Sequence, residues 1–205
     1  MASLTALAVL GLGACDSGSD ADLAAAAGPS VIVPGEPGEA NRTISAEEAE
    51  RRRADDDSPN SADVAYARMM IQHHAQAMEM TELVPERAES GQVKKLAERI
   101  SAAQGPEITA MRGWLTSHGR EETGGGHEHA TMPGMASEAQ LAKLRAADGK
   151  AFDQLFLTLM ITHHEGAITM ATDVKSQGNN VQIEEMADDV VAQQTSEISR
   201  MRGML

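Results

Sequence analysis

Two pairs of adjacent histidines, His73–His74 and His163–His164, are the residues of this sequence best suited to chemistry. The pairs lie in similar segments, "MMIQHHAQAM" and "LMITHHEGAI", and each has a methionine three residues before its first histidine. Imidazole nitrogen and thioether sulfur form a soft-to-borderline ligand set that suits Cu(I) and Cu(II). The spacing predicts a metal site to which both segments contribute.

Helical spacing brings further donors to the level of these histidines. If each pair lies on a helix, both imidazoles flank a buried stripe and reach the interior. The following helix must run antiparallel, so residues near 104 and 194 share the same level, and both are Gln. The further candidate ligands at this level are Met70, Met160, Met111, Met201, Glu107 and Glu197.

A glycine-rich linker between the two segments contains a second candidate group. Residues 117–135 read "SHGREETGGGHEHATMPGM", in which His127, His129, Met132 and Met135 could bind a metal ion while the glycines let the chain wrap around it. A flexible site of this kind suits capture and transfer of an ion, whereas catalysis needs a rigid site.

Other interpretations of the same residues remain open. The histidines could hydrogen-bond to Glu107, Glu197 and the glutamines, forming polar layers that fix the register of the helices. A metal oxidase that uses iron or copper is a second alternative, and a metal-free helical interaction module is a third. The di-iron pattern of E-x-x-H on two helices is not reproduced, and no cysteine outside the N-terminal segment offers a thiolate for zinc. Copper is therefore the expected metal, with iron as the alternative.

The two segments belong to an internal duplication. Residues 63–115 align with residues 153–205 at a constant offset of ninety without a gap, and 18 of the 53 pairs are identical. Self-similarity at a fixed offset indicates that one structural unit occurs twice.

Each copy predicts two helices. The first copy predicts helices over about 61–84 and 91–115, because Pro85 disfavours a helical residue before it. Pro106 predicts a kink in the second of these. The second copy predicts helices over about 151–175 and 180–204, and the capping pair Ser137 and Gln140 predicts a short helix in the linker 116–152. Two hairpins with one apolar face each predict an all-α four-helix bundle over 61–205.

Composition supports helices and limits the partners. The chain has one Trp, one Tyr and two Phe but 13 Met, so its core must be built from aliphatic residues and methionine, which favour helices. The net charge of −14 excludes nucleic acid as an expected partner, because binding to phosphates requires basic patches.

The N-terminal residues predict export and a tether. "LTALAVLGLGAC" is apolar but too short to span a bilayer, and it ends in the one cysteine, Cys15. It resembles a bacterial lipoprotein signal in which Cys15 is lipidated, although the usual basic residue before the apolar run is missing. A secretory signal with an incidental cysteine is the alternative. Residues 16–60 are rich in Asp, Gly, Ser and Pro and predict a flexible, disordered tether with a short helix at 46–54.

Several motifs together resemble the domain-of-unknown-function family 305. They are "MMIQHHAQAMEM", "QGPEITAM", "MPGM", "FDQLFLTLMITHHEGAITMA" and "QQTSEISRM", which span most of 61–205. The resemblance implies a ferritin-like four-helix bundle in secreted or lipid-anchored bacterial proteins, and copper binding of the CopM type. It carries over His73, His74, His163, His164, Met132 and Met135 as ligands.

Taken together, the residues and the resemblance predict an extracytoplasmic, periplasmic or lipid-anchored protein of the cell envelope. We expect it to sequester or transfer copper without acting on an organic substrate. Its expected partners are metal ions, and the membrane only through the lipid. A homodimer is also compatible with the sequence.

Overall fold

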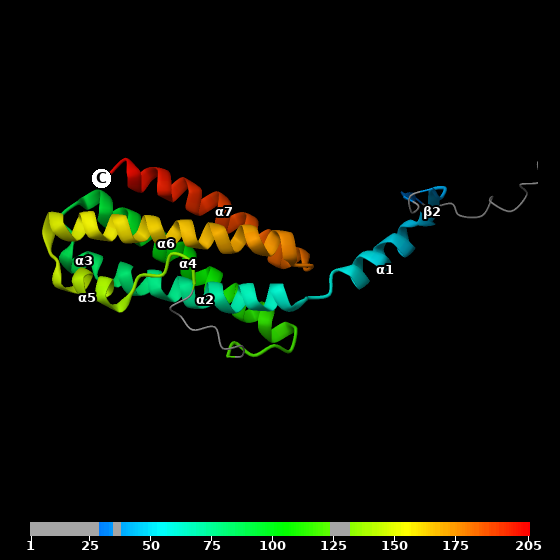
Figure 1. Ribbon diagram of the computed structural model, residues 1–205, viewed down its shortest axis with the longest axis horizontal. Coiled ribbons are helices and arrows are strands. Elements are labelled where there is room, and N and C mark those ends of the chain that lie inside the picture. Colours follow the sequence, from blue (N-terminus) through cyan, green and yellow to red (C-terminus); the bar gives the residue numbers. More distant parts are fainter. Residues whose placement is uncertain (1–28, 35–37, 124–131) are drawn as a thin grey trace, which may run out of the picture. The chain divides into compact units, whose positions relative to one another are not determined.

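The computed structural model describes residues 29–34, 38–123 and 132–205, and the chain divides into two units, Met1–Arg52 and Arg53–Leu205. Cys15, His127 and His129 therefore lie outside the described residues. The described part of the chain is mostly helical (Figure 1).

The first unit contains a small hairpin that the sequence analysis did not predict. Strands β1 (Ser30–Val33) and β2 (Arg42–Ser45) pair antiparallel, with Val31 opposite Ile44. Their β-branched residues favour extended backbone, although Ile32 remains 67% exposed. Helix α1 (Ala46–Asp56) follows directly, where a short helix over 46–54 was predicted.

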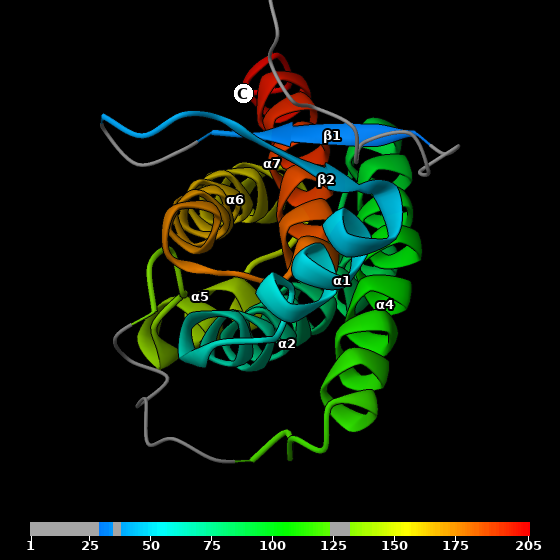
Figure 2. The same cartoon turned by 90° about the vertical axis from the view of Figure 1, so that its right-hand side faces the viewer.

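The second unit is built from two helical hairpins, as the duplication predicted. The first hairpin consists of α2 (Ser61–Glu82) and α4 (Gly91–Ser117), with the one-turn helix α3 (Val84–Arg87) between them. The second hairpin consists of α6 (Gly149–Gln177) and α7 (Val181–Arg202), and α5 (Glu138–Ala146) precedes it. Helix α2 also packs against α6, and in Figure 2 α6 is seen nearly end-on whereas α4 and α7 cross the view obliquely.

Local signals set the helix boundaries. Asn60 caps α2 in a capping box with Asp63, and Ser90 caps α4 through its hydroxyl. The predicted capping box of Ser137 and Gln140 is confirmed at the start of α5. Helix α4 continues as a helix through Pro106.

A polar layer divides the interior of this unit into two apolar cores. On each long helix, the buried residues of one core give way to buried polar residues and then to the residues of the other core. These buried residues and the partly buried Glu107 form what we call the polar layer: His73, His74, Gln104, Glu107, His163, His164, Gln194 and Glu197. One core contains Phe152, Phe156 and Met160, and the other contains Tyr66, Met70 and Met111.

Two buried aspartates tie the hairpins to each other. Asp63 of α2 accepts from the backbone N–H of Asn179, in the turn before α7, at 3.1 and 3.2 Å. Its counterpart Asp153 of α6 accepts from the backbone N–H of Ser90, in the turn before α4, at 2.8 Å. The duplication thus supplies a matched pair of links between the hairpins.

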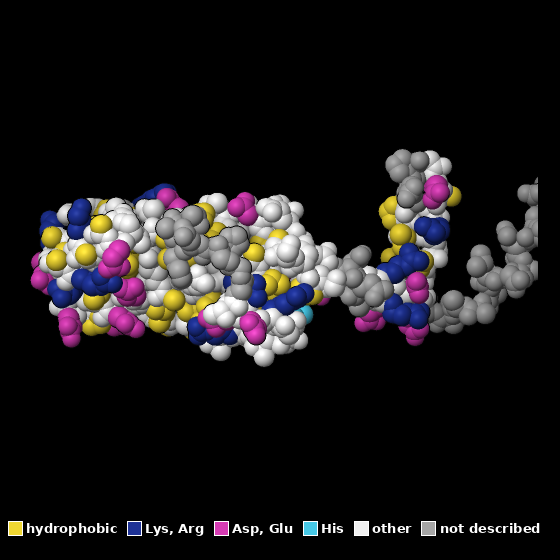
Figure 3. All heavy atoms as spheres, turned by 60° about the horizontal axis from the view of Figure 1, so that its bottom comes forward, with side chains coloured by type: hydrophobic (Ala, Val, Ile, Leu, Met, Phe, Trp, Pro, Cys, Tyr) yellow, Lys and Arg dark blue, Asp and Glu magenta, His cyan; other side chains and the backbone are white. Residues whose placement is uncertain are grey.

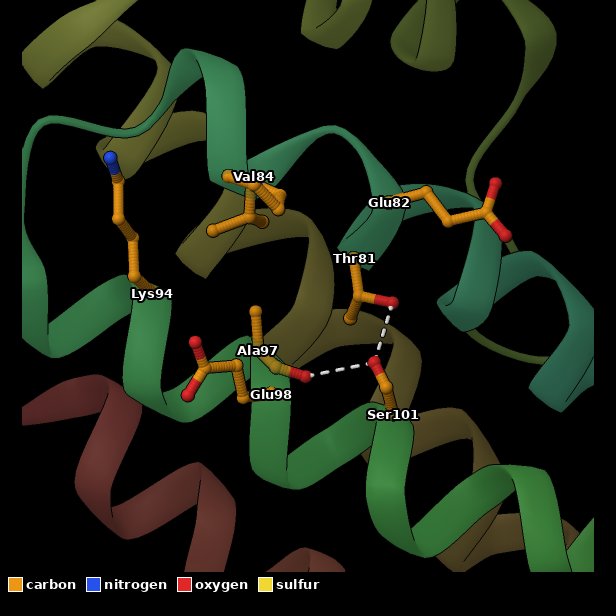
Figure 4. Close-up of a pocket in the computed structure, with 8 residues that line it drawn as sticks. Thr81, Glu82, Val84, Lys94, Ala97, Glu98 and Ser101 are labelled. Carbon is orange, nitrogen blue, oxygen red and sulfur yellow. Dashed lines mark hydrogen bonds between the residues drawn. The ribbon is translucent and has the colours of Figure 1, made fainter.

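The corner between α2, α3 and α4 is hollowed at the surface. Ser101 donates to the hydroxyl of Thr81 at 3.3 Å and to the carbonyl of Ala97 at 3.1 Å, across the floor of the hollow (Figure 4). Within the described ranges, no helix is both long and apolar enough to cross a membrane.

Candidate metal centre

The four paired histidines lie in the middle of the helical unit. All four side chains are fully buried. The rings of His73 and His163, one from each hairpin, lie face to face with 3.7 Å between their centroids and 37° between their planes. The centroids of adjacent rings are 6.5 Å apart in the first pair and 6.4 Å apart in the second. The two pairs thus form one continuous cluster.

The outer histidine of each pair is held by a carboxylate from the next helix. Nε2 of His74 lies 2.8 Å from Oε2 of Glu107, and Nε2 of His164 lies 2.8 Å from Oε2 of Glu197. Because an ionised carboxylate only accepts, Nε2 is the donor in both pairs. A neutral imidazole that donates from Nε2 keeps a lone pair on Nδ1. In both halves that Nδ1 is buried and has no hydrogen-bond partner among the residues that the structure describes.

The "MPGM" turn covers the inner histidines. Nε2 of His73 donates to the carbonyl of Pro133 at 3.0 Å. The turn packs so closely on α6 that a Cβ added at either Gly134 or Gly166 would lie within 3.0 Å of backbone atoms of the other segment. Gly134 also has a φ of +78°, which favours glycine. Two glycines therefore allow the turn to lie directly on the histidine layer.

Many polar atoms of the layer have no partner. These are Nδ1 of His73, both ring nitrogens of His163, and both side-chain polar atoms of Gln104 and Gln194. An unpartnered buried polar group costs about 1–3 kcal/mol of folding free energy. A layer with so many is less stable than an apolar one would be, which is the arrangement expected where a ligand supplies the missing interactions.

The inner histidines are neutral at physiological pH. Burial, and then the neighbouring His74, lowers the pKa of His73 to about 3, against the raising effect of its bond to Pro133. Burial, and then the other three imidazoles, lowers the pKa of His163 well below its ordinary value. Neutral rings offer lone pairs to a metal ion without first losing a proton.

The candidate methionines lie in both apolar cores. Met70, Met111 and Met132 belong to one core, and Met160 and Met201 to the other, all of them buried. Met135 is half-buried against the first of these cores. Within residues 29–34, 38–123 and 132–205, no three His, Cys, Asp or Glu side chains converge as a preformed metal cage. An ion bound here would take sulfur ligands or require a shift of the rings.

The sequence also matches a known family. The profile of the family described as "Domain of unknown function (DUF305)" matches residues 63–205, which comprise both copies of the duplication. The chain belongs to the DUF305 family. The chain matches none of the curated proteins with which it was compared.

Solved DUF305 structures share this architecture. A DUF305 protein of Streptomyces coelicolor, described as secreted, is 34% identical, with a TM-score of 0.67 over 71% of this chain and 92% of the other. A DUF305 fragment of Deinococcus radiodurans is 33% identical, with a TM-score of 0.66 over 71% of this chain and 96% of the other. CopM in its Cu(II)-bound form is 31% identical, with a TM-score of 0.60 over 69% of this chain and 94% of the other.

One feature of this DUF305 site was missed by the sequence analysis. Gln76 and Gly166 are counterparts in the duplication; Gly166 lies against the "MPGM" turn, and Gln76 contacts Ala136, the residue that follows it. The side chain of Gln76 donates to the carbonyl of Ala136 at 2.9 Å and accepts from its N–H at 2.7 Å, whereas Gly166 makes room for Pro133. The histidine segments of α2 and α6 are otherwise similar, but position 76 is Gln where its counterpart, position 166, is Gly. This difference was the signal that the same stretch of the linker contacts both helices.

Proposed function

We propose that this DUF305 chain is an extracytoplasmic copper-binding protein that sequesters copper or passes it on through the polar layer. The main support for the proposal is a set of buried imidazole nitrogens that have no hydrogen-bond partner among the described residues. Two of them belong to rings whose other nitrogen donates to a carboxylate. That arrangement is typical of histidine ligands, whose second nitrogen donates to a carboxylate or carbonyl.

The ligand roles follow from the hydrogen bonds. Nδ1 of His74 and of His164 are the best-oriented donors, and Glu107 and Glu197 orient these rings rather than bind the ion. His163 adds two ring nitrogens that make no hydrogen bond of standard geometry with any residue that the structure describes. The thioethers nearest the layer along the chain, those of Met70, Met111, Met160 and Met201, complete a soft set suited to Cu(I).

Three further assignments belong to the same proposal. The four long helices form a ferritin-like bundle, within which the layer is the metal site. The linker residues His127, His129, Met132 and Met135 capture copper and hand it to the layer, with the buried Met132 as the innermost of the four. Copper-bound CopM among the similar structures supports the choice of metal.

The location rests on Cys15 and the apolar residues before it. We propose that Cys15 is lipidated and anchors the chain to the outside of the cell membrane, with residues 16–60 as the tether. Membrane fractionation of the wild type and of Cys15→Ser tests this assignment. The variant should move to the soluble fraction, and its retention in the membrane would contradict the lipid anchor.

Competition for Cu(I) tests the metal site. Under anaerobic, reducing conditions the full chain should withdraw Cu(I) from a chromogenic chelator. The variant with His73, His74, His163 and His164 all replaced by Ala should lose most of this capacity. The matched control is His118→Ala, whose ring lies outside the layer and contacts Trp114. Undiminished competition by the fourfold variant would move the site to the linker, and no competition by the wild type would refute copper binding.

A further inference from the structure

The two halves of the helical unit differ sharply in charge at one place, the start of the second helix of each hairpin. In α4 three positions in the first turns are basic, and the positions ninety residues later in α7 are acidic. The three pairs are Lys94 with Glu184, Lys95 with Glu185, and Arg99 with Asp189. The sign of the charge is reversed in all three pairs, although the two copies are identical at 18 other positions. This difference requires an explanation.

The basic residues border a groove between α4 and the end of α7. We call it the basic groove; Lys95 and Arg99 of α4 and Arg200 of α7 line it, together with the apolar side chains of Leu96 and Met204. No carboxylate lines the groove. None of its three cations has an ion pair with any residue that the structure describes.

Lys94 is not part of the basic groove. It borders the hollow beside α3, together with Glu82 and Glu98 (Figure 4). Acidic side chains therefore lie beside Lys94. On the side of α4 that faces α7, by contrast, no carboxylate lies beside the basic residues.

Helix stability does not account for these cations. The N-terminus of a helix carries partial positive charge, so Lys94 in the first turn of α4 is unfavourably placed, whereas α7 has Glu184 there. This effect falls off within the first turn. Lys95 and Arg99 lie beyond that turn, so the helix dipole does not favour cations at their positions.

The counterpart of the basic groove is acidic and exposed. We call Glu185 and Asp189 the acidic face; both side chains are exposed, and neither has an ion pair within the described residues. Because α4 and α7 begin at opposite ends of the helical unit, the basic groove and the acidic face lie at opposite ends as well. On the face seen in Figure 3, by contrast, charges of both signs are intermixed.

We propose that the basic groove binds the acidic face of a second copy of this chain, in an antiparallel dimer. Lys95 and Arg99 are four residues apart on one helix, and so are Glu185 and Asp189, so the two cations can meet the two carboxylates at matched spacing. In an antiparallel arrangement the basic groove of each chain contacts the acidic face of the other. Both contacts form at once, and the dimer closes with two-fold symmetry. The partly exposed side chain of Met204 gives the contact a hydrophobic component.

Charge exchange tests the dimer with the full chain and without metal. In sedimentation equilibrium the average mass of the wild type should rise with concentration toward two chains. Two double variants should associate at least about tenfold more weakly than the wild type, because like charges then face each other. The variant Lys95→Glu/Arg99→Glu is acidic at both ends, and the variant Glu185→Lys/Asp189→Arg is basic at both ends. Their equimolar mixture should form a heterodimer, since every contact then pairs opposite charges.

The control variant Lys143→Glu/Lys150→Glu changes the net charge as much as Lys95→Glu/Arg99→Glu does, but at exposed positions outside both surfaces. It should leave association unchanged. Thermal unfolding checks that each variant is folded. A monomeric wild type together with a monomeric mixture would overturn the proposal. So would binding of poly-glutamate to the basic groove without any self-association, which would assign the groove to a different acidic partner.

Discussion

At the scale of single residues, the carboxylates that hold His74 and His164 decide how these rings can act. Each carboxylate fixes the proton on Nε2 and so leaves Nδ1 open toward the interior. Glu197 is 2% exposed and Glu107 is 22% exposed, so the pairing in the second half is the better protected from water.

Replacing Glu197 by Gln tests this orienting role. The amide oxygen of Gln can accept from Nε2, but without the negative charge of the carboxylate. Alternatively, the amide N–H can donate to Nε2, which moves the imidazole proton to Nδ1. Either change makes Nδ1 a weaker ligand. We expect the Cu(I) affinity to fall by about 10–100-fold with the fold retained. Glu107→Gln should cause a smaller loss because its side chain is partly hydrated. Chelator competition measures both, and an unchanged affinity in both variants would remove the carboxylates from the site.

The neutral inner histidines predict how stability depends on pH. An unfolded chain binds protons on these imidazoles at a pKa of about 6.5, whereas the pKa of His73 in the folded protein is about 3. The unfolded state therefore holds more protons throughout this interval. The free energy of unfolding must fall as the pH drops below about 6.5, by up to about 1.4 kcal/mol per pH unit for each such histidine.

Urea unfolding of the metal-free chain between pH 7 and pH 4 measures this slope. His163→Leu removes one of the neutral imidazoles and should make the dependence shallower, because burial also lowers the pKa of His163. It also replaces unpartnered polar atoms by an apolar side chain, so the variant should be more stable than the wild type. Equal slopes in the two proteins would show that His163 is not held neutral.

At the scale of helices and turns, much of the arrangement follows from the sequence. The predicted bounds of the four long helices agree with the structure to within a few residues, because apolar periodicity acts locally. Helix α2 ends before Pro85 as predicted, but the expectation that the residue before Pro85 is not helical was wrong, since Val84 begins α3. The common level of the histidines and Gln104 followed from antiparallel pairing. The strands β1 and β2 were missed, since four-residue strands are too short to show a pattern among Gly, Pro and Glu.

The position of the "MPGM" turn could not be predicted. It depends on close approach between the backbone of the turn and that of α6, which the sequence shows only as Gly134 and Gly166. The sequence also could not distinguish a carboxylate that binds an ion from one that orients a histidine, because Glu107 and Glu197 have the chemistry for both.

Gly166→Ala tests whether the turn must rest on α6. The added methyl group would overlap the backbone of Pro133, so the turn must move and the bond from His73 to the Pro133 carbonyl should break. We expect a loss of about 1–3 kcal/mol in the free energy of unfolding and weaker Cu(I) binding. Gly113→Ala is the matched control: it lies in α4 with open space around its Cα, and alanine should stabilise the helix by up to about 1 kcal/mol. Equal effects of the two substitutions would contradict the contact.

At the scale of the whole molecule, polar contacts join the two hairpins in addition to the packing of α2 against α6. The aspartates Asp63 and Asp153 link them through the turns, and the polar layer brings His73 against His163 at the centre. An ion bound by histidines of both hairpins would add a third link, so metal binding and stability should be coupled.

Asp63→Ala shows whether this coupling exists. The substitution leaves the N–H groups of Asn60 and Asn179 without their acceptor, and should lower the free energy of unfolding of the metal-free protein by about 1–3 kcal/mol. The exposed Asp173→Ala should change it by less than about 0.5 kcal/mol. Cu(I) at a free concentration about a hundredfold above its dissociation constant adds about 2.7 kcal/mol to the folded state, so it should restore most of the loss. Restoration must disappear when the four paired histidines are also replaced by Ala; if copper stabilises that variant equally, the ion binds elsewhere and does not join the hairpins.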